Sequence, residues 1–254
     1  MKQKNVPAVE RALNILELLG ESKEPLSFTQ ILKQLHISKP SLSRLLCNLK
    51  ERDYIQHNTT TKKYGLGINL LHLGNRVLER IDIREKAQPF LRELMEKSGE
   101  TVELGILDDD ALLFIDKWES SKSIRLFAQV GSRFSKLHAS APGKVLLTYI
   151  PEEDFKRFIR KGLVKVTKHT ITKIGKLGEE LEKIKKQGYG FDDQEVREGV
   201  RRFASPVFNH QGNLTGVVGI AGPAFRMPLK KKPTLGKMVK AIAEKISKSL
   251  GYRK

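Results

Sequence analysis

Leucines with helical spacing mark the stretch around which the first part of the chain is organised. Within residues 38–52 they recur at i, i+3, i+4 and i+7, and this spacing predicts an amphipathic helix with one apolar side. That side would face a hydrophobic core, while the opposite side stays free for other contacts. The four leucines are Leu42, Leu45, Leu46 and Leu49.

The opposite side of this predicted helix carries short and basic side chains. Ser38 is a natural N-cap, and Pro40 suits the first turn because its missing N–H has no helical partner there. Hydroxyl groups and a guanidinium on the first turns suit the major groove of DNA, where short side chains let the backbone approach the bases. A solvated helix face is the alternative. We expect DNA contacts from Ser38, Lys39, Pro40, Ser41, Ser43 and Arg44.

Two further helices are predicted before this one. The first would be amphipathic, and the second begins at Ser27, whose hydroxyl can cap the helix while Gln30 reaches back in a capping box. About three residues separate the second helix from the third, which is the spacing of a helix-turn-helix. Ser27 and Thr29, at the start of the second helix, join the expected DNA contacts. The apolar positions of the first helix are Val9, Ala12, Leu13, Leu16 and Leu19.

Two short strand-like runs, YIQH and KKYGLG, follow the third helix and are joined by the turn-forming NTTT. Three helices and a hairpin predict a winged helix-turn-helix domain over residues 1–67, and the helical pattern after it predicts a linker helix over residues 68–82. Hydroxyl groups, Lys62 and Lys63 at the hairpin suit phosphate or minor-groove contacts. A solvated hairpin is the alternative.

The second half, residues 83–254, mixes strands and helices, which predicts an antiparallel or mixed sheet covered by helices, and the fold class of the whole chain as α+β. Strands are expected at TVELGIL, ALLFIDKW, VRRFASPVF and LTGVVGIAG, with another near residues 123–128. Helices are expected over residues 84–98, 142–149, 152–161 and 178–187, and at the carboxy terminus.

Composition narrows the class of protein. The chain has 254 residues, of which 39% are hydrophobic and 30% charged, and we expect two soluble domains. The sequence predicts neither a membrane span nor a secretory segment. We therefore expect a cytoplasmic protein. The net charge of +18 is concentrated at the two ends: residues 1–80 carry 13 basic and 7 acidic side chains, and residues 226–254 carry 10 and 1. This distribution fits a polyanionic partner, although the basic carboxy-terminal segment could equally be a solubilising surface.

Motifs for catalysis are missing from the sequence. APGKV departs from a phosphate-binding loop because Val145 follows Lys144 where Ser or Thr is needed, and the acidic run at residues 108–110 is typical of a turn. The six histidines show no ligand spacing, and no serine sits in a nucleophile elbow. We therefore expect no catalytic residue, no metal and no cofactor.

The whole chain resembles the IclR-type (isocitrate lyase regulator) family of bacterial transcription factors. In the first half the similarity lies in VPAVERALNILELL, SLSRLLCNLKERDYI and KYGLGINLLHLG. In the second half it lies in GETVELGIL, LHASAPGKVLL and GYGFDDQEVREGVRRFASPVFNHQGNLTGVVGIAGP. The resemblance implies an amino-terminal DNA-binding domain and a GAF-like carboxy-terminal effector domain with a ligand cavity.

The same resemblance places effector contacts at Asp192, Arg202, Gly219 and Ala221. Family members that bind small carboxylates tend to have Cys and two Ser at the last three positions, so this chain has lost hydroxyl donors and gained a guanidinium. We expect Arg202 to hold an anionic effector larger than a two- or three-carbon acid. The equal alternative is a structural Arg202 paired with Asp192 or Glu195. The other expected pocket residues are Glu195 and, beside the small-residue stretch, Ala139, Gly143 and His138, for which a structural role is the alternative.

Together these observations predict a sequence-specific DNA-binding regulator, more often a repressor in such families, whose operator affinity depends on a small-molecule effector. It would bind double-stranded DNA at an inverted repeat as a homodimer or a dimer of dimers, because one short helix reads too few base pairs. The main alternative is an enzyme of α/β class with a nucleic-acid-binding module. Constitutive DNA packaging would fit the charge of +18, but not the nearly balanced middle of the chain.

Overall fold

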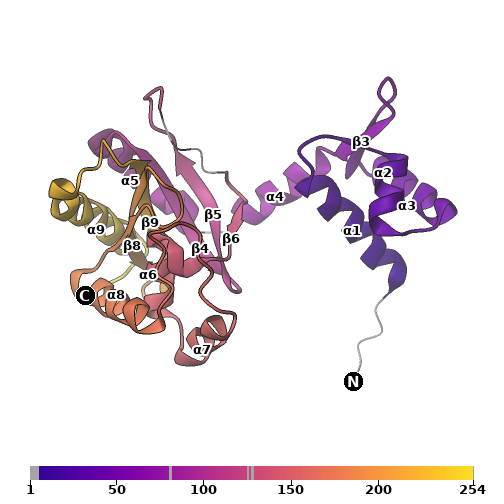
Figure 1. Ribbon diagram of the computed structural model, residues 1–254. Coiled ribbons are helices and arrows are strands. Elements are labelled where there is room, and N and C mark those ends of the chain that lie inside the picture. The colour runs from indigo at the N-terminus through magenta and orange to yellow at the C-terminus, as the bar shows by residue number, and fades with distance from the viewer. Residues whose placement is uncertain (1–5, 80–81, 125, 127–128, 254) are drawn as a thin grey trace. The chain divides into compact units, whose positions relative to one another are not determined.

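The computed structural model of the protein describes residues 6–79, 82–124, 126 and 129–253. The chain divides into two units, Met1–Arg80 and Ile81–Lys254 (Figure 1). Each unit has its own secondary structure and its own core, and each is described by itself. Among the described residues, no helix is long and apolar enough to cross a membrane.

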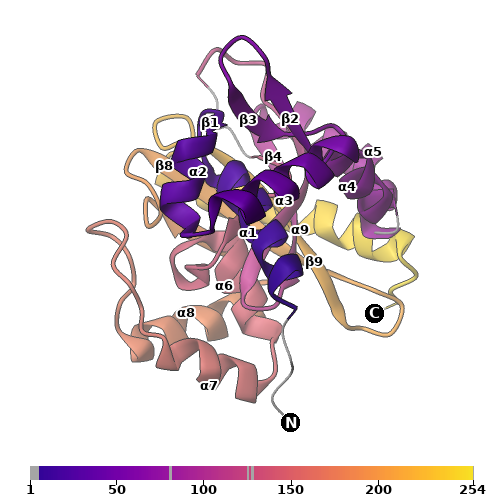
Figure 2. The ribbon, with the colours of Figure 1, turned by 90° about the vertical axis from the view of Figure 1, so that its right-hand side faces the viewer.

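The amino-terminal unit is a winged helix-turn-helix, as the sequence predicted. Its three strands form an antiparallel sheet in the order β1-β3-β2, and the β2–β3 hairpin is the wing (Figure 2). The elements are α1 (Pro7–Glu21), β1 (Leu26–Ser27), α2 (Phe28–Leu35), α3 (Lys39–Glu51), β2 (Ile55–Asn58), β3 (Lys63–Leu66) and α4 (Asn69–Glu79).

The capping box at Ser27 is present and fixes where α2 begins. The Gln30 backbone N–H donates to Ser27 Oγ at 3.3 Å, and the Ser27 N–H donates to Gln30 Oε1 at 2.8 Å. Helix α2 ends at His36, which has a left-handed φ of 51° and turns the chain into α3. The core beneath α3 contains the predicted leucines: Leu42, Leu46 and Leu49 are buried, and Leu45 packs against them.

Helix α1 differs from the prediction in which apolar side it buries. Ile15 and Leu19 enter the core, whereas Val9 and Leu13 are 56% and 52% exposed. Of the five predicted apolar positions, Leu19 is therefore buried, whereas Val9 and Leu13 remain exposed. This helix carries apolar residues on two sides, and helical spacing alone does not show which side packs on the neighbouring helices.

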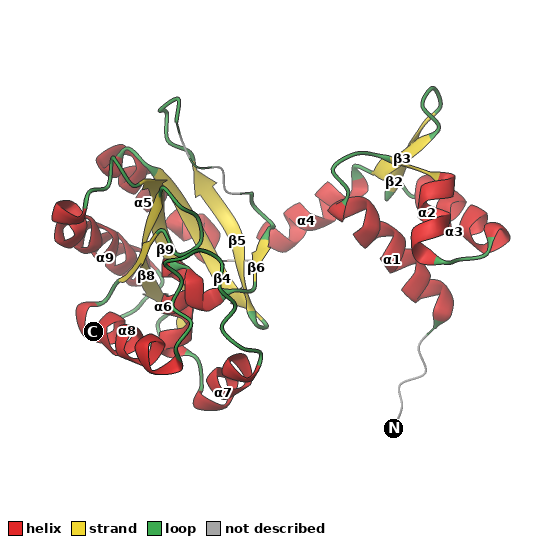
Figure 3. Cartoon of the chain, viewed as in Figure 1, coloured by secondary structure: helices red, strands yellow, loops and turns green. Residues whose placement is uncertain are grey.

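The carboxy-terminal unit is built on a six-stranded antiparallel sheet in the order β6-β5-β4-β9-β8-β7 (Figure 3). The strands are β4 (Thr101–Asp108), β5 (Ala111–Trp118), β6 (Arg133–Phe134), β7 (Gly190–Asp193), β8 (Val200–Phe208) and β9 (Leu214–Pro223). The helices are α5 (Asp82–Ser98), α6 (Ala141–Tyr149), α7 (Glu152–Arg160), α8 (Ile174–Gln187) and α9 (Lys232–Ser249), with short 3-10 turns η1 (Leu137–Ala139) and η2 (Leu229–Lys231).

Helices lie on both faces of this sheet, with α5 and α9 side by side on one of them (Figures 1 and 3). On the other face, α6 and α8 share a hydrophobic core with the β8 and β9 residues Ala204 and Val217. Alternation along β8 places Arg202 on the same side as Ala204, so its side chain lies on the α6 face. The sheet therefore presents Arg202 on the α6 side.

Two predicted segments lie partly outside the described residues. Residues 125, 127 and 128 of the expected strand near residues 123–128 lie outside the described residues; the strand that pairs with β5 is β6, further along the chain. Residues 80 and 81 of the expected linker are also outside the described residues, and α4 falls in the amino-terminal unit. Strand β7, which the sequence analysis did not predict, pairs Asp192 with Arg202.

Candidate functional site

The first turns of α3 present an exposed polar surface. Ser43 and Arg44 are exposed on the helix, and Ser41 is half-buried. Ser38 occupies the N-cap position, but its hydroxyl donates to Ser41 Oγ at 3.0 Å and makes no cap bond to the backbone. The backbone N–H groups of this turn therefore lack a side-chain cap, and such N–H groups favour an anion.

Most of the basic side chains of this surface have no carboxylate partner among the described residues. Within the described chain, Lys39, Arg44 and Lys62 form no ion pair, whereas Lys63 Nζ lies 3.9 Å from Glu24 Oε2. Cations that are exposed and unpaired remain free to contact phosphates or base edges. Ser27 is half-buried and engaged in its capping box, and its neighbour Thr29 is exposed at the start of α2.

The wing is shaped by Asn58. Its Oδ1 accepts hydrogen bonds from the backbone N–H groups of Thr60 and Thr61, both at 2.9 Å, and this closes the turn. Lys62 completes the turn with a left-handed φ of 56° and is exposed. The tip of the wing is therefore a defined turn that presents a lysine to solvent.

Cys47 lies on the exposed side of α3. Its thiol donates to Glu51 Oε1 at 3.3 Å, and this hydrogen bond is the main reason that the Cys47 pKa is raised. A raised pKa keeps the thiol protonated and weakly nucleophilic at neutral pH. The side chain therefore belongs to the polar surface without providing a reactive group.

A cavity of about 300 Å³ lies on the α6 side of the sheet in the carboxy-terminal unit. Arg202 and Glu103 reach it from β8 and β4, and Ser140 and Pro142 reach it from the start of α6. The remaining lining is mostly apolar, so a few polar groups would orient a bound molecule. The cavity is lined by Glu103, Leu112, Phe114, Gln129, Ser132, Phe134, Ser140, Pro142, Val196 and Arg202.

A buried network of charges supports one side of this cavity. Arg202 Nη1 donates to Asp192 Oδ2 at 3.3 Å, and Asp192 Oδ1 accepts from the Glu195 backbone N–H at 2.6 Å. Glu195 in turn accepts at 2.6 Å from Lys144 Nζ, and the Lys144 side chain is only 1% exposed. One connected set of ion pairs and hydrogen bonds therefore runs from the cavity into the core.

Burial controls the protonation of this network. It raises the pKa of Asp192 although Arg202 opposes the shift, and it raises the pKa of Glu195 to about 7 although Lys144 opposes it. Glu195 Oε2 is buried, and no described residue donates a hydrogen bond to it. The desolvation of these carboxylates thus destabilises their charged forms more than the neighbouring cations stabilise them.

The structure does not place the predicted residues His138, Ala139 and Gly143 on the cavity wall. His138 Nε2 lies 3.0 Å from the Val164 carbonyl oxygen, and burial lowers the pKa of His138, which favours the neutral ring. A Cβ on Gly143 would lie 2.3 Å from the Leu137 carbonyl oxygen, so Gly143 allows α6 to pack against η1. Their geometry is that of a packed support for α6.

Two predicted positions on β9 lie in the middle of the sheet. Gly219 is in register with Glu103 on β4 and Ala204 on β8, while Ala221 is in register with Arg202. These small residues leave the space between β4 and β8 without side-chain donors. Neither residue is among those lining the cavity, which their lack of long side chains explains.

Sequence reasoning missed Glu103 and Ser140. Glu103 is the single charged residue inside the apolar strand TVELGIL. A carboxylate at a strand position that is expected to be buried indicates a candidate functional residue. Ser140 looked like part of a small-residue stretch, but its Oγ accepts from the Gly143 N–H at 3.1 Å and caps α6. Both residues line the cavity beside Arg202.

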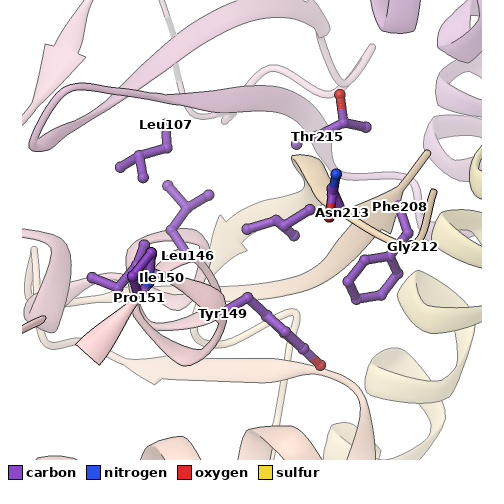
Figure 4. Close-up of a pocket in the computed structure, with 11 residues that line it drawn as sticks. Leu107, Leu146, Tyr149, Ile150, Pro151, Phe208, Gly212, Asn213 and Thr215 are labelled. Carbon is purple, nitrogen blue, oxygen red and sulfur yellow. The ribbon is translucent and has the colours of Figure 1, made fainter. Parts of the chain in front are cut away.

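Another hollow of about 360 Å³ opens between the end of α6 and the β8–β9 turn (Figure 4). Leu146 and Tyr149 from α6 and Phe208 from β8 contribute to it, and its lining contains no charged side chain. It therefore offers an anion no charged group. Among the described residues there is also no group of three or more His, Cys, Asp or Glu side chains that could hold a metal ion.

Comparison with known proteins agrees with this architecture. The sequence profile of the IclR helix-turn-helix domain matches residues 8–59, and the profile of the bacterial transcriptional regulator IclR C-terminal domain matches residues 75–248. The chain is 34% identical over 250 residues to the HTH-type transcriptional regulator BhcR of Paracoccus denitrificans, covering 98% of this chain and 89% of that protein.

It is also 32% identical over 249 residues to the regulator KdgR of Dickeya chrysanthemi, covering 98% of this chain and 81% of that protein. Among solved structures, the Thermotoga maritima IclR superposes with a TM-score of 0.79 at 30% identity, covering 98% of this chain and all of that one. These relatives are transcriptional regulators and not enzymes. The chain belongs to the IclR family of bacterial transcriptional regulators.

Proposed function

We propose that the protein is a sequence-specific repressor whose affinity for its operator is controlled by a small anionic effector bound in the carboxy-terminal unit. The observation that carries this proposal is the exposed start of α3, where Arg44 forms no ion pair with a described residue and the Ser38 side chain makes no cap hydrogen bond. Repression is favoured because several relatives at 28–31% identity are named as repressors. An operator-binding protein of this kind would act where the chromosome lies, in the cytoplasm.

In this proposal the residues of the amino-terminal unit have distinct roles. Arg44, with Ser41 and Ser43, reads base edges in the major groove, while Lys39, Lys62 and Lys63 contact phosphates. Ser38 and Pro40 shape the turn that approaches the groove, and Ser27 and Thr29 contact the backbone from the start of α2. The exposure of Thr29, Ser38, Lys39, Pro40, Ser43, Arg44 and Lys62 supports the assignment, while Ser27, Ser41 and Lys63 are half-buried.

Replacing Arg44 with Ala tests the function directly. A guanidinium that reads a base contributes to specific binding only, so Arg44→Ala should cost about 1–3 kcal/mol on the operator and relax specificity at one position. Fluorescence anisotropy on operator and random DNA measures both. Arg52→Ala, which removes the same charge just beyond the other end of α3, is the matched control. Equal losses on operator and random DNA for Arg44→Ala would contradict the role.

A homodimer on an inverted repeat is the proposed DNA-binding form, with a dimer of dimers as the alternative. Two helices of the amino-terminal unit leave apolar side chains exposed, and such residues favour association with a second copy. A dimer would place two α3 helices about one helical turn of DNA apart. The exposed residues are Val6, Val9 and Leu13 on or beside α1, and Ile68, Leu71 and Leu73 on or beside α4.

Arg202 is the proposed anion-binding group of the effector cavity. Its guanidinium has five N–H donors, and the bond to Asp192 uses Nη1, so other donors remain for a carboxylate or phosphate. A cavity of about 300 Å³ accommodates molecules larger than two- or three-carbon acids. An effector that weakens operator binding must itself bind more weakly to the DNA-bound protein by the same factor.

Replacing Arg202 with Met separates this role from a purely structural one. Because Arg202 pairs with the buried Asp192, Arg202→Met should lower thermal stability in either case. If Arg202 also holds the effector, the folded variant should still bind the operator but lose its response to effectors, whereas a purely structural Arg202 predicts that the response survives. Operator binding with and without metabolite pools, together with thermal unfolding, measures these outcomes. A stable variant that still responds fully would exclude both roles.

A further inference from the structure

Glu103 is a buried carboxylate that faces the effector cavity without a partner. Its side chain is 7% exposed and lines the cavity, and no described residue donates a hydrogen bond to it or forms an ion pair with it. An isolated carboxylate removed from water is costly, so such groups normally have a partner or become protonated. Burial raises the pKa of Glu103, although the charge of Arg202, which forms no hydrogen bond with it, opposes the shift.

The cations near Glu103 are already engaged. Arg202 pairs with Asp192 at 3.3 Å, and Lys144 pairs with Glu195 at 2.6 Å. Lys117, the cross-strand neighbour of Glu103 on β5, donates to Glu119 at 2.6 Å. Among the described residues, Asp192 and Glu195 therefore hold Arg202 and Lys144, and Glu103, the carboxylate without a hydrogen-bond partner, is the one that faces the cavity.

The geometry of the sheet leaves room for a ligand between Glu103 and Arg202. Strand β9 separates their strands, so the backbones of β4 and β8 lie about 10 Å apart. Gly219, in register with Glu103, has no side chain to fill this space or to donate a hydrogen bond. A molecule bound over β9 would therefore meet a carboxylate at one end and a guanidinium at the other.

We propose that Glu103 determines the specificity of this cavity by accepting a hydrogen bond from a hydroxyl or ammonium group of the effector, whose acidic group lies at Arg202. The inference rests on the proposed effector-binding function and names its ligand class: hydroxy acids or amino acids, in preference to plain carboxylic acids. The hydroxyl or ammonium group of the effector would be the hydrogen-bond partner that Glu103 lacks among the described residues. A plain acid leaves the carboxylate unpaired and binds more weakly.

The stability of the ligand-free protein provides the first test. Removing an unpaired buried charge relieves a cost, so Glu103→Gln should raise the midpoint of thermal unfolding at pH 8. Glu100→Gln is the matched control, because Glu100 is equally buried but is held by Arg226 through Nε at 2.6 Å and Nη2 at 2.7 Å. Glu100→Gln should lower the midpoint of thermal unfolding. A Glu103→Gln protein less stable than the wild type would overturn the proposal.

Ligand preference provides the second test. Full-length protein is titrated by calorimetry with hexanoate and with its 2-hydroxy, 2-amino, 6-hydroxy and 6-amino derivatives. At least one substituted acid should bind the wild type about 10- to 100-fold more tightly than hexanoate. Glu103→Leu should abolish this preference. Glu103→Gln should keep it if the donor is a hydroxyl and lose it if the donor is an ammonium, because an amide oxygen accepts a hydrogen bond but carries no charge.

The outcomes separate this inference from the proposed function. Equal binding of hexanoate and all four derivatives, no binding of any of them, or a preference that survives in Glu103→Leu overturns the role of Glu103. Operator binding is measured on the same samples without ligand. Its absence would overturn the proposed function, whatever the calorimetry shows.

Discussion

The two units hold their charged side chains in opposite ways. On the amino-terminal unit, Arg44 and Lys62 are exposed and form no ion pair with described residues, whereas beside the cavity of the carboxy-terminal unit Lys144 and Arg202 are engaged with buried carboxylates. Exposed cations are free to meet a polyanion and contribute little to stability. Buried cations are fixed by their partners, so a ligand must fit an existing network.

This difference predicts that charge removal has different consequences in the two units. In the amino-terminal unit it should change DNA binding and leave folding intact. Around the cavity it should change the free energy of unfolding first, because breaking a buried pair leaves an uncompensated charge. Three substitutions test this difference between the two units.

The largest effect is expected for Lys144→Met. It leaves Glu195 without its cation in a site where the lysine is 1% exposed, and it should lower the free energy of unfolding by about 3–5 kcal/mol. Urea denaturation measures this change. Lys156→Met is the control, since its partner Glu152 lies at 2.7 Å on an exposed helix surface, and it should cost less than about 1 kcal/mol. Similar losses in both variants would remove the distinction between buried and exposed pairs.

A smaller, pH-dependent effect is expected for Glu195. Its pKa is raised from the ordinary value of 4.5 to about 7, so between these values the folded protein binds a proton that the unfolded protein has released. The contribution of Glu195 to stability is therefore fully present below about pH 4.5 and is lost as pH rises through about 7, by roughly 3 kcal/mol. Glu195→Gln lacks this titration.

Denaturation of the wild type and Glu195→Gln from pH 4.5 to pH 8 measures the difference. Glu103, whose pKa is also raised by burial, titrates in both proteins and cancels in the comparison. Asp192 interacts with Glu195, so any change in its titration belongs to the same measured difference. The wild-type curve should fall more steeply with pH than the curve of the variant. Parallel curves would show that Glu195 ionises as it does in the unfolded chain.

The smallest effect is expected for Lys62 at the tip of the wing. If it contacts one phosphate, Lys62→Ala should weaken binding to operator and random DNA alike and lower the slope of log K against log salt by about one. Stability should not change, because Lys62 has no partner among the described residues. Lys176→Ala, at an exposed position of α8, is the control for loss of charge alone. An unchanged salt slope would remove the wing from the DNA interface.

Local patterns in the sequence determined the amino-terminal unit. The leucine spacing of α3 and the capping box at Ser27 depend on residues within two helical turns, and the structure confirms both. The candidate DNA contacts followed from the same local pattern, since the side of α3 opposite the leucines is the exposed one. In the second half, the period of two along β8 places Arg202 and Ala204 on one face, and this depends on the strand alone.

Tertiary structure decided which residues meet around the cavity. Lys144 pairs with Glu195, 51 positions away, and Glu103 lies across β9 from Arg202 because β4 and β8 both pair with the same strand. Helix α1 buries Ile15 in the core and leaves Leu13 exposed. The His138 ring contacts the Val164 carbonyl oxygen, 26 positions away. The spacing of residues along the chain indicates only which side of its own helix or strand a residue occupies. Its partners depend on strand order and helix docking, which arise from packing between segments far apart in the sequence.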